Sequence, residues 1–255
     1  MAESNGLWTI QPLAFGEFPT VEKSGYTYSR GQGEKISSPA ISFLLRSGEE
    51  KILVDTGPVE PTQEHHPSHT PLRRAANQAP SSALAEIGLS PEDFDTVVLT
   101  HLHYDHSQNL ELFSNASFIL QAEELRAAVD PVRAQRSMYE FALPDFVPSW
   151  MKVTSRIRTV RGDHQLRPGL TLLHLPGHTP GMQGLLVQTA KGRYVLSGDL
   201  VSSYDNLGDG PDDWVVPGIH TDVYACERSM ERILSADAEI IPSHDWRVFD
   251  TAVYG

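Results

Sequence analysis

The stretch "VVLTHLHYDHSQN" at positions 97–109 limits what this chain can fold into more than any other. Directly behind an apolar, β-branched run it holds His101, His103, Asp105 and His106, four residues of metal-ligand type in six positions of a chain with 11 histidines. Alternate side chains of an extended segment share a face, so His101 and His103 point the same way, and the Asp/His pair follows where the chain bends. The stretch therefore predicts two histidines for one metal ion and an Asp/His pair for a neighbouring ion.

Four residues cannot complete the coordination of two metal ions, and three further residues of ligand type follow predicted strands. "LLHLPGHTPG" places His178 in a Pro/Gly turn, "YVLSGDLV" places Asp199 at the mouth of an apolar strand, and "EIIPSHDW" places His244 after the last strand. The ends of strands are where α/β folds gather their chemistry. We therefore expect these three side chains to join the histidine cluster.

The ligand types indicate the chemistry but leave the metal open. Imidazole and carboxylate suit Zn²⁺, our first choice for two divalent ions, and equally Mn²⁺, Fe²⁺ or Co²⁺. Paired metals lower the pKa of a shared water and clamp both the attacking and the departing oxygen. The pattern thus predicts hydrolysis of a polarised carbonyl or phosphoryl group. The sequence contains no competing GxSxG elbow, P-loop or GxGxxG motif.

Strand-like and helical segments alternate along both halves of the chain. Strands are predicted in 7–18, 40–47, 50–57, 95–100, 116–121, 170–177, 184–189, 193–199 and 238–243, and helices in 81–94, 122–129 and 222–236. This order predicts an α/β or α+β sandwich formed by a single domain, residues 1–255. The long segments 58–82 and 130–152 have little periodicity, and we expect them to cap the active site.

Composition narrows the partners and the compartment. The formal net charge of -13 makes a surface that repels phosphate backbones and anionic lipid, so we expect neither nucleic acid nor membrane as a partner. The start "MAESNGLWTIQPLAF" lacks a basic n-region and a continuous apolar run, and the single cysteine, Cys226, excludes an internal disulfide. These features favour a reducing, cytoplasmic setting.

Four motifs, "HLHYDH", "GHTPG", "SGD" and "SHD", occur in an order that resembles the hydrolases of the metallo-β-lactamase fold, over roughly residues 40–245. The resemblance implies a four-layer αβ/βα sandwich of two β-sheets with helices outside. It also assigns the ligands of a dinuclear site. By this resemblance the first metal is held by His101, His103 and His178, the second by Asp105, His106 and His244, and Asp199 bridges the two.

Within this fold the chain resembles the N-acyl homoserine lactonases. "ILVDTG" is followed by a long loop and "LTHLHYDHSQN", the tail reads "PGIHTDVYACERSMERI", and "IIPSHD" closes the pattern. This resemblance implies a small-molecule substrate, ring opening of a lactone by metal-bridging hydroxide, and a monomer or homodimer. Hydrolysis of another ester, thioester or amide is the alternative. A binding protein without turnover is a third possibility, against which the complete ligand set argues.

One position departs from the lactonase pattern. Lactonases of this branch generally place a tyrosine three residues after the bridging aspartate, and here that residue is Ser202, with Tyr204 as the nearest phenol. Either the loop shifts to bring Tyr204 to the substrate, or the metal alone stabilises the oxyanion, or the substrate differs. The candidates for catalytic roles are Asp105, Tyr204 and His220, the last as a pocket-lining residue.

Overall fold

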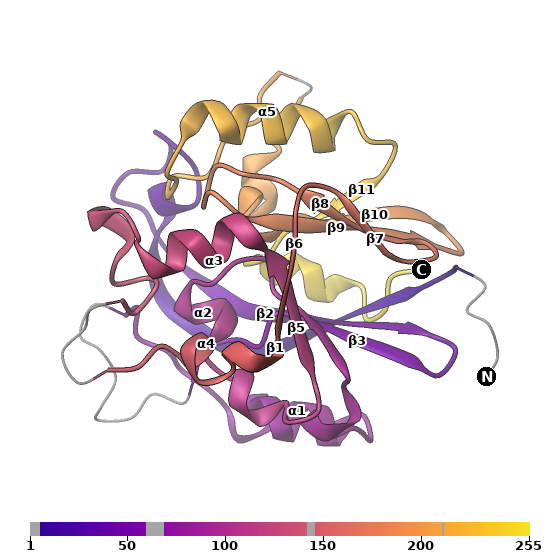
Figure 1. Ribbon diagram of the computed structural model, residues 1–255. Coiled ribbons are helices and arrows are strands. Elements are labelled where there is room, and N and C mark those ends of the chain that lie inside the picture. Colours follow the sequence, from indigo (N-terminus) through magenta and orange to yellow (C-terminus); the bar gives the residue numbers. More distant parts are fainter. Residues whose placement is uncertain (1–5, 60–68, 142–145, 211) are drawn as a thin grey trace.

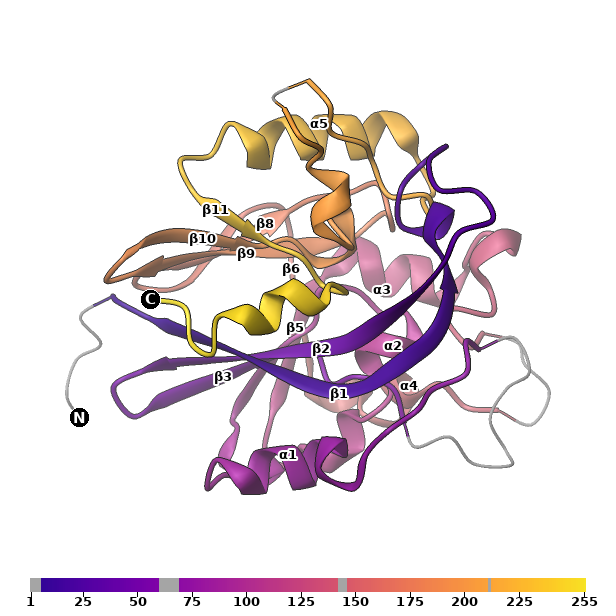
Figure 2. The same ribbon diagram turned by 180° about the vertical axis from the view of Figure 1, so that it is seen from behind.

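Two β-sheets packed face to face form the centre of the computed structural model, which describes residues 6–59, 69–141, 146–210 and 212–255 (Figure 1). The first sheet has the strand order β1-β2-β3-β4-β5-β6 and the second has the order β11-β10-β9-β8-β7. Helix α1 lies outside the first sheet and α5 outside the second (Figures 1 and 2). The predicted sandwich of two sheets with helices outside is confirmed.

The elements of the two sheets and the helices have the following bounds. The first sheet consists of β1 (Thr9–Glu22), β2 (Lys35–Ser47), β3 (Glu50–Val54), β4 (Thr96–Val98), β5 (Ser117–Gln121) and β6 (Ile157–Val160). The second consists of β7 (His164–Arg167), β8 (Leu170–His174), β9 (Gln183–Thr189), β10 (Gly192–Leu196) and β11 (Glu239–Ile241). The α-helices are α1 (Pro80–Glu86), α2 (Tyr104–Ser107), α3 (Ala122–Val129), α4 (Ser149–Lys152) and α5 (Val223–Leu234).

Strand direction within the sheets determines where the site forms. Strands β3, β4, β5 and β6 run parallel to one another, and β10 runs parallel to β11. The carboxyl ends of neighbouring parallel strands meet at one edge of a sheet. The loops that follow β4, β10 and β11 are therefore gathered at corresponding edges of the two packed sheets.

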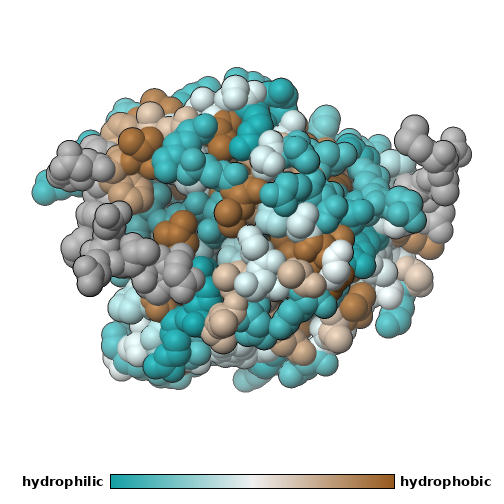
Figure 3. Space-filling model, turned by 90° about the horizontal axis from the view of Figure 1, so that it is seen from below, coloured by the Kyte–Doolittle hydropathy of each residue, from teal (hydrophilic) through white to brown (hydrophobic). Residues whose placement is uncertain are grey.

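Alternation along the strands separates the apolar layers. In β3, Ile52 and Val54 face the layer between the two sheets, whereas Leu53 faces the layer beneath α1. This is the two-residue period of a strand that is buried on both faces. A third apolar layer joins the second sheet to α5, through residues such as Met230 and Ile233. The outer surface seen from below is mostly hydrophilic, with small apolar patches (Figure 3).

Two strands were not predicted. β6 and β7 are the edge strands of their sheets, and most of their residues are partly or fully exposed. An edge strand needs no apolar alternation, so the sequence carried little signal for either one. The first strand also extends beyond its predicted end at residue 18, because β1 pairs with β2 as far as Glu22. Part of the predicted loop 58–82 and part of 130–152 fall outside the described residues.

Gly177 joins the start of α5 to the loop that carries His178. Its carbonyl accepts hydrogen bonds from the backbone N–H groups of Thr221 (2.8 Å) and Asp222 (3.1 Å). Its φ is +142°, and a Cβ at this position would lie 2.5 Å from the backbone nitrogen of Cys226. Only glycine therefore permits this close approach.

Within the described part of the chain, no helix is long and apolar enough to cross a bilayer.

We predict that Gly177→Ala destabilises the fold much more than Gly192→Ala. Gly192 has a similar φ, +137°, but a Cβ there would meet nothing within 4 Å. Both variants share a backbone strain of ~1–3 kcal/mol, because this region of backbone conformation is nearly restricted to glycine. The contact with Cys226 should add ~1–3 kcal/mol of overpacking to Gly177→Ala alone. Urea unfolding of both variants measures the difference, and equal losses of unfolding free energy would contradict this reading of Gly177.

Candidate metal centre

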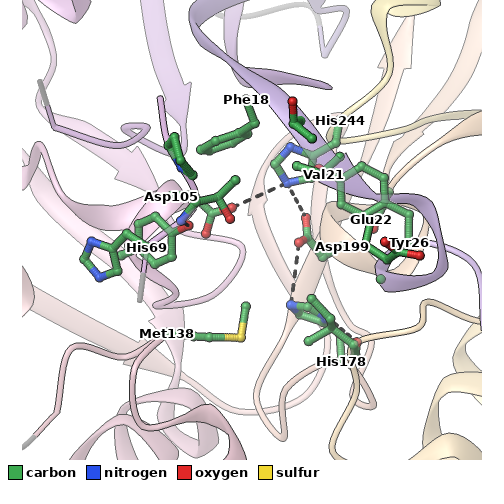
Figure 4. A pocket seen from close by; sticks show the side chains of 17 residues that line it. Phe18, Val21, Glu22, Tyr26, His69, Asp105, Met138, His178, Asp199 and His244 are labelled. Atoms are coloured by element: carbon green, nitrogen blue, oxygen red, sulfur yellow. Dashed lines mark hydrogen bonds and ion pairs between the residues drawn. The ribbon is translucent and has the colours of Figure 1, made fainter. Parts of the chain in front are cut away.

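Side chains from four strand ends converge on one place in the structure. His101 and His103 lie in the extended segment after β4, and Asp105 and His106 lie on α2, which begins at Tyr104. The other side chains follow β8, β10 and β11, and they are His178, Asp199 and His244. Figure 4 shows Asp105, His178, Asp199 and His244 directed toward one another. The structure thus brings together all seven residues that the sequence singled out as ligands.

Three histidines form the first group. Ligand atoms of His101, His103 and His178 all lie within 4.8 Å of one another, and all three residues are buried. Nε2 of His178 is 3.0 Å from Nδ1 of His103, and the ring centroids of His101 and His103 are 4.5 Å apart. The two histidines that alternate along the extended segment therefore do share a face.

Asp105, His106 and His244 form the second group, and Asp199 lies between the two groups. Nε2 of His244 is 3.2 Å from Nε2 of His106. Oδ1 of Asp199 is 3.2 Å from Nε2 of His106, whereas its Oδ2 is 3.6 Å from Nε2 of His178. One carboxylate thus presents an oxygen to each group, which is the arrangement that a bridging ligand requires.

Buried atoms in the site test whether a metal ion would fit. Nε2 of His101 and Oδ1 of Asp105 are buried and have no hydrogen-bond partner among the described residues. An unpaired buried polar atom costs about 1–3 kcal/mol, so a fold does not retain several of them without a compensating ligand. Burial, together with the neighbouring histidines, lowers the pKa of His101 and that of His103, which keeps both imidazoles neutral. Neutral imidazole is the form that binds a metal, so the residues fit the expected ions.

The electrostatics of the second group favour a positive charge. Burial opposes the charged form of His106, but the carboxylates of Asp199, Asp105 and Asp55 outweigh it and hold its pKa well above the usual value. Burial likewise disfavours ionised Asp199, yet His106 and His244 hold the pKa of that carboxyl well below its usual value. Without a cation, protons on histidines compensate the buried carboxylates. A divalent ion would supply the same positive charge.

Outer hydrogen bonds fix which nitrogen of three histidines faces the site. Nδ1 of His106 donates to Asp55 (2.8 Å), Nδ1 of His178 donates to the carbonyl of Ile219 (2.7 Å), and Nδ1 of His244 donates to the carbonyl of Pro39 (3.0 Å). In each ring Nε2 is left free to bind a metal. Such outer partners set the tautomer and the orientation of a metal-ligating histidine.

Asp55 is a functional residue that reasoning from the sequence missed. It also accepts hydrogen bonds from the backbone N–H and the hydroxyl of Thr100, both at 2.7 Å. Its φ of +61° is left-handed, a conformation that Asn and Asp tolerate better than other residues with a side chain. The available signal was its place in "ILVDTG", directly after a strand, as for the ligands themselves.

A cavity of about 380 Å³ adjoins the metal-ligand cluster. Asp105, His178, Asp199, Ser202 and His244 are among its lining residues, and apolar side chains form another part of its wall. The apolar side chains include Phe18, Val21 and Met138 (Figure 4), and also Ile219. Residues 69–71 and Met138 line the cavity, and they belong to the segments 58–82 and 130–152 that were expected to cap the site. The sequence did not predict that β1 would also line the cavity, through Phe18 and Val21.

The structure does not place Tyr204 where the predicted substrate contact needs it. Tyr204 packs against the apolar layer between the sheets, its hydroxyl interacts with that of Tyr254, and the guanidinium of Arg247 lies 5.0 Å from its ring centroid. It is absent from the lining of the cavity, where Ser202 is found. The loop after Asp199 therefore has not shifted to substitute Tyr204 for the missing phenol.

His220 also lies outside the cavity lining, although its neighbour Ile219 belongs to it. Nδ1 of His220 donates to the carbonyl of Pro217 (2.8 Å), and its ring packs edge-on against Tyr28. Two phenols do reach the cavity: Tyr26, whose ring stacks on His244 with centroids 5.5 Å apart, and Tyr104, whose hydroxyl accepts from the backbone N–H of Thr70 at 3.0 Å. Sequence reasoning missed Tyr26, because no motif surrounds it.

Comparison with known proteins agrees with this geometry. The profile of the "Metallo-beta-lactamase superfamily" matches residues 39–244, which is most of the chain. The chain belongs to the metallo-β-lactamase superfamily. An N-acyl homoserine lactonase from Bacillus sp. is 32% identical to this chain over 177 residues. The match covers 64% of this chain and 64% of the Bacillus lactonase.

Solved structures share the fold over nearly the whole chain. An N-acyl homoserine lactone hydrolase with the product N-hexanoyl-L-homoserine bound at its catalytic metal center matches with a TM-score of 0.75 and 23% identity, covering 95% of each chain. AidC, a dizinc quorum-quenching lactonase in complex with a product, matches with a TM-score of 0.71 and 19% identity, covering 96% of this chain and 89% of AidC. At these identities the likeness shows the common fold.

Replacing Asp55 by Asn should weaken metal binding by ~10–100-fold, the usual effect of losing an outer partner of a metal ligand. An amide nitrogen in place of Oδ2 would donate to Nδ1 of His106 and move the ring proton to Nε2, the atom that faces the site. Asn also tolerates the left-handed backbone at this position. Asp93→Asn, on an exposed turn, serves as the control. Chelator competition measures the affinity, and wild-type affinity in Asp55→Asn would refute the role.

Proposed function

We propose that this superfamily member is a dinuclear metal-dependent hydrolase that opens the ring of a lactone of the N-acyl homoserine lactone type. The observation that carries the proposal is the convergence of seven His and Asp side chains beside one cavity with a partly apolar wall. The relative from Bacillus sp. is a lactonase for this class of substrate. The solved structure with bound N-hexanoyl-L-homoserine supports a small molecule of the same kind as the partner.

We propose zinc for both ions, since imidazole and carboxylate suit it and AidC is a dizinc enzyme. Mn²⁺, Fe²⁺ and Co²⁺ remain alternatives with the same ligands. The first ion would be held by His101, His103 and His178, the second by Asp105, His106 and His244, and Asp199 would be shared. When bound, two such ions supply a water of lowered pKa and polarise a carbonyl group.

The cavity residues divide the remaining tasks. Phe18, Val21, Met138 and Ile219 provide apolar surface that excludes water and suits an acyl chain. Asp105 lines the same cavity, and its buried Oδ1 has no hydrogen-bond partner in the described part of the chain. We propose that the Asp105 oxygen that does not bind the second ion holds a proton for the departing ring oxygen, in keeping with the catalytic role expected of Asp105.

Ser202 favours a second candidate, a hydrolase of another ester, thioester or amide. Ser202 lines the cavity at the position where lactonases generally have a tyrosine, and Tyr204 does not replace it there. The hydroxyl of Tyr26 is engaged as well. Ser38 donates to the carbonyl of His244, so the Tyr26 hydroxyl donates to Ser38 at 2.7 Å. Tyr104, the other phenol of the lining, accepts from the backbone N–H of Thr70 (3.0 Å), so the second candidate rests on Ser202 and on the position of Tyr204 outside the cavity.

Replacing Asp199 by Ala should lower kcat/KM at least ~100-fold and reduce the metal content from about two ions per chain, because a shared ligand acts on both ions. The assay is acid release from N-acyl homoserine lactones of long and short chain, measured with a pH indicator beside aryl esters and a glutathione thioester. Asp237→Ala, at an exposed residue, is the control. A fully active Asp199→Ala would overturn the metal centre, and turnover of esters but not lactones would select the second candidate.

Tyr204→Phe should change kcat on the best substrate by less than about twofold, because a group that does not touch the substrate contributes nothing specific to the transition state. Tyr204 lies away from the cavity because its ring packs between the sheets and against Arg247. Steady-state kinetics on the substrate found in the screen measures the effect. A loss of more than about tenfold in kcat would restore Tyr204 as the phenol that acts in place of Ser202.

A further inference from the structure

Glu124, in the first turn of α3, carries a buried carboxylate that the proposed chemistry does not use. Its side chain is fully buried and accepts four hydrogen bonds. Oε1 accepts from the backbone N–H of Leu102 and the hydroxyl of Tyr139, both at 2.9 Å. Oε2 accepts from the hydroxyl of Thr179 (2.6 Å) and the backbone N–H of Gly181 (3.2 Å).

The positions of these four donors define what Glu124 connects. Leu102 is the residue between His101 and His103, and Thr179 directly follows His178. One carboxylate therefore joins the two segments that supply the three-histidine group. These segments lie far apart in the sequence and meet across the edges of different sheets, so their relative position depends on contacts such as this one.

Packing around Glu124 reinforces the connection. Tyr139 donates its hydroxyl hydrogen to Glu124, and its ring packs edge-on against His103 with ring centroids 4.8 Å apart. A Cβ on Gly181 would lie 2.0 Å from the backbone nitrogen of Glu124, so α3 sits directly against the loop that follows His178. Gln135, from the segment after α3, donates to the carbonyl of His178 at 3.0 Å.

Burial raises the pKa of the Glu124 carboxyl above its usual value, and the four hydrogen bonds act against burial by favouring the ionised form. An ionised carboxylate accepts at about four lone-pair sites, and four donors occupy them here. A buried negative charge is retained when it is well hydrogen-bonded and compensated by positive charge nearby. The three-histidine group, which Glu124 adjoins through Leu102 and Thr179, would hold such a charge once a divalent ion is bound.

We propose that Glu124 is a positioning residue that holds His101, His103 and His178 at the spacing required by the first metal ion. It acts by fixing the backbone on both sides of that ion and not by contact with it. The inference deepens the metal-centre part of the proposed function and does not depend on the identity of the substrate. It predicts that loss of the Glu124 carboxylate weakens the three-histidine site selectively.

The test measures metal binding in the absence of substrate. Glu124→Gln keeps the shape of the side chain but turns one acceptor into a donor, which faces either Leu102 and Tyr139 or Thr179 and Gly181. Zn²⁺ content is followed against increasing concentrations of a competing chelator. We expect one ion of the pair to be lost at ~10–100-fold lower chelator strength than in the wild type, with the other largely retained.

Glu123→Gln is the matched control, since it makes the same chemical change at the neighbouring residue of α3. Glu123 pairs with Arg161 on the surface, so its variant should bind both ions as the wild type does. The absorption spectrum of the Co²⁺ form gives a second readout, because it reports ligand geometry. Glu124→Gln should alter this spectrum and Glu123→Gln should not. Wild-type affinity and an unchanged Co²⁺ spectrum in Glu124→Gln would overturn the proposal.

Milder variants keep the test decisive if Glu124→Gln fails to fold. Thr179→Val removes the hydroxyl that donates to Glu124, whereas Thr179→Ser keeps a hydroxyl at this position. We expect the Val variant to lower the affinity for one ion and the Ser variant to recover it. Equal affinities in the two variants would refute the role of Glu124. A wild-type protein that binds no divalent ions would instead refute the dinuclear centre itself, so the two failures can be told apart.

Discussion

The packing of two sheets on a shared apolar layer is the constraint on which the rest of the molecule depends. Ile52, Val54 and Val98 from the first sheet meet Leu185, Leu196 and other side chains of the second sheet in this layer. The packing brings the carboxyl ends of β4, β8, β10 and β11 to one place, although β4 ends at Val98 and β11 at Ile241. Every ligand of the candidate centre lies just beyond such an end.

Burial at this place makes the electrostatics stringent. Asp55 and all five histidines that could ligate a metal are 4% exposed or less, and Asp199 is 6% exposed. Charges in such surroundings are stable only when they compensate one another. The carboxylates of Asp199 and Asp105 raise the pKa of His106, which shows how strongly the region favours positive charge. Divalent ions would satisfy this demand and the orphaned ligand atoms together.

Around the ligands lies a layer of residues that orient them. Asp55, the carbonyls of Ile219 and Pro39, and Glu124 each bind a ligand or the backbone beside it. Sequence reasoning found none of these roles. Asp55 lies in the segment "ILVDTG", for which the sequence predicted no role at the site, and Glu124 lies in a helical segment with no motif around it. Their partners come from other parts of the chain, and no local pattern records such pairings. The same limit explains Tyr204, whose nearness to Asp199 in sequence did not bring it into the cavity.

The sequence by itself determined which residues of metal-ligand type converge and in what order they occur, because ligand chemistry and placement after an apolar strand are local properties. "HLHYDH", "GHTPG", "SGD" and "SHD" carry them in four short segments. It also determined the interior strands, whose apolar patterns come from burial on both faces. Only the tertiary structure decided which nitrogen of each histidine faces the site, which side chains wall the cavity, and what holds the histidine segments in register. Those features depend on contacts between residues distant in the sequence, and a metal ligand must lie within about 0.2 Å of its ideal distance from the ion.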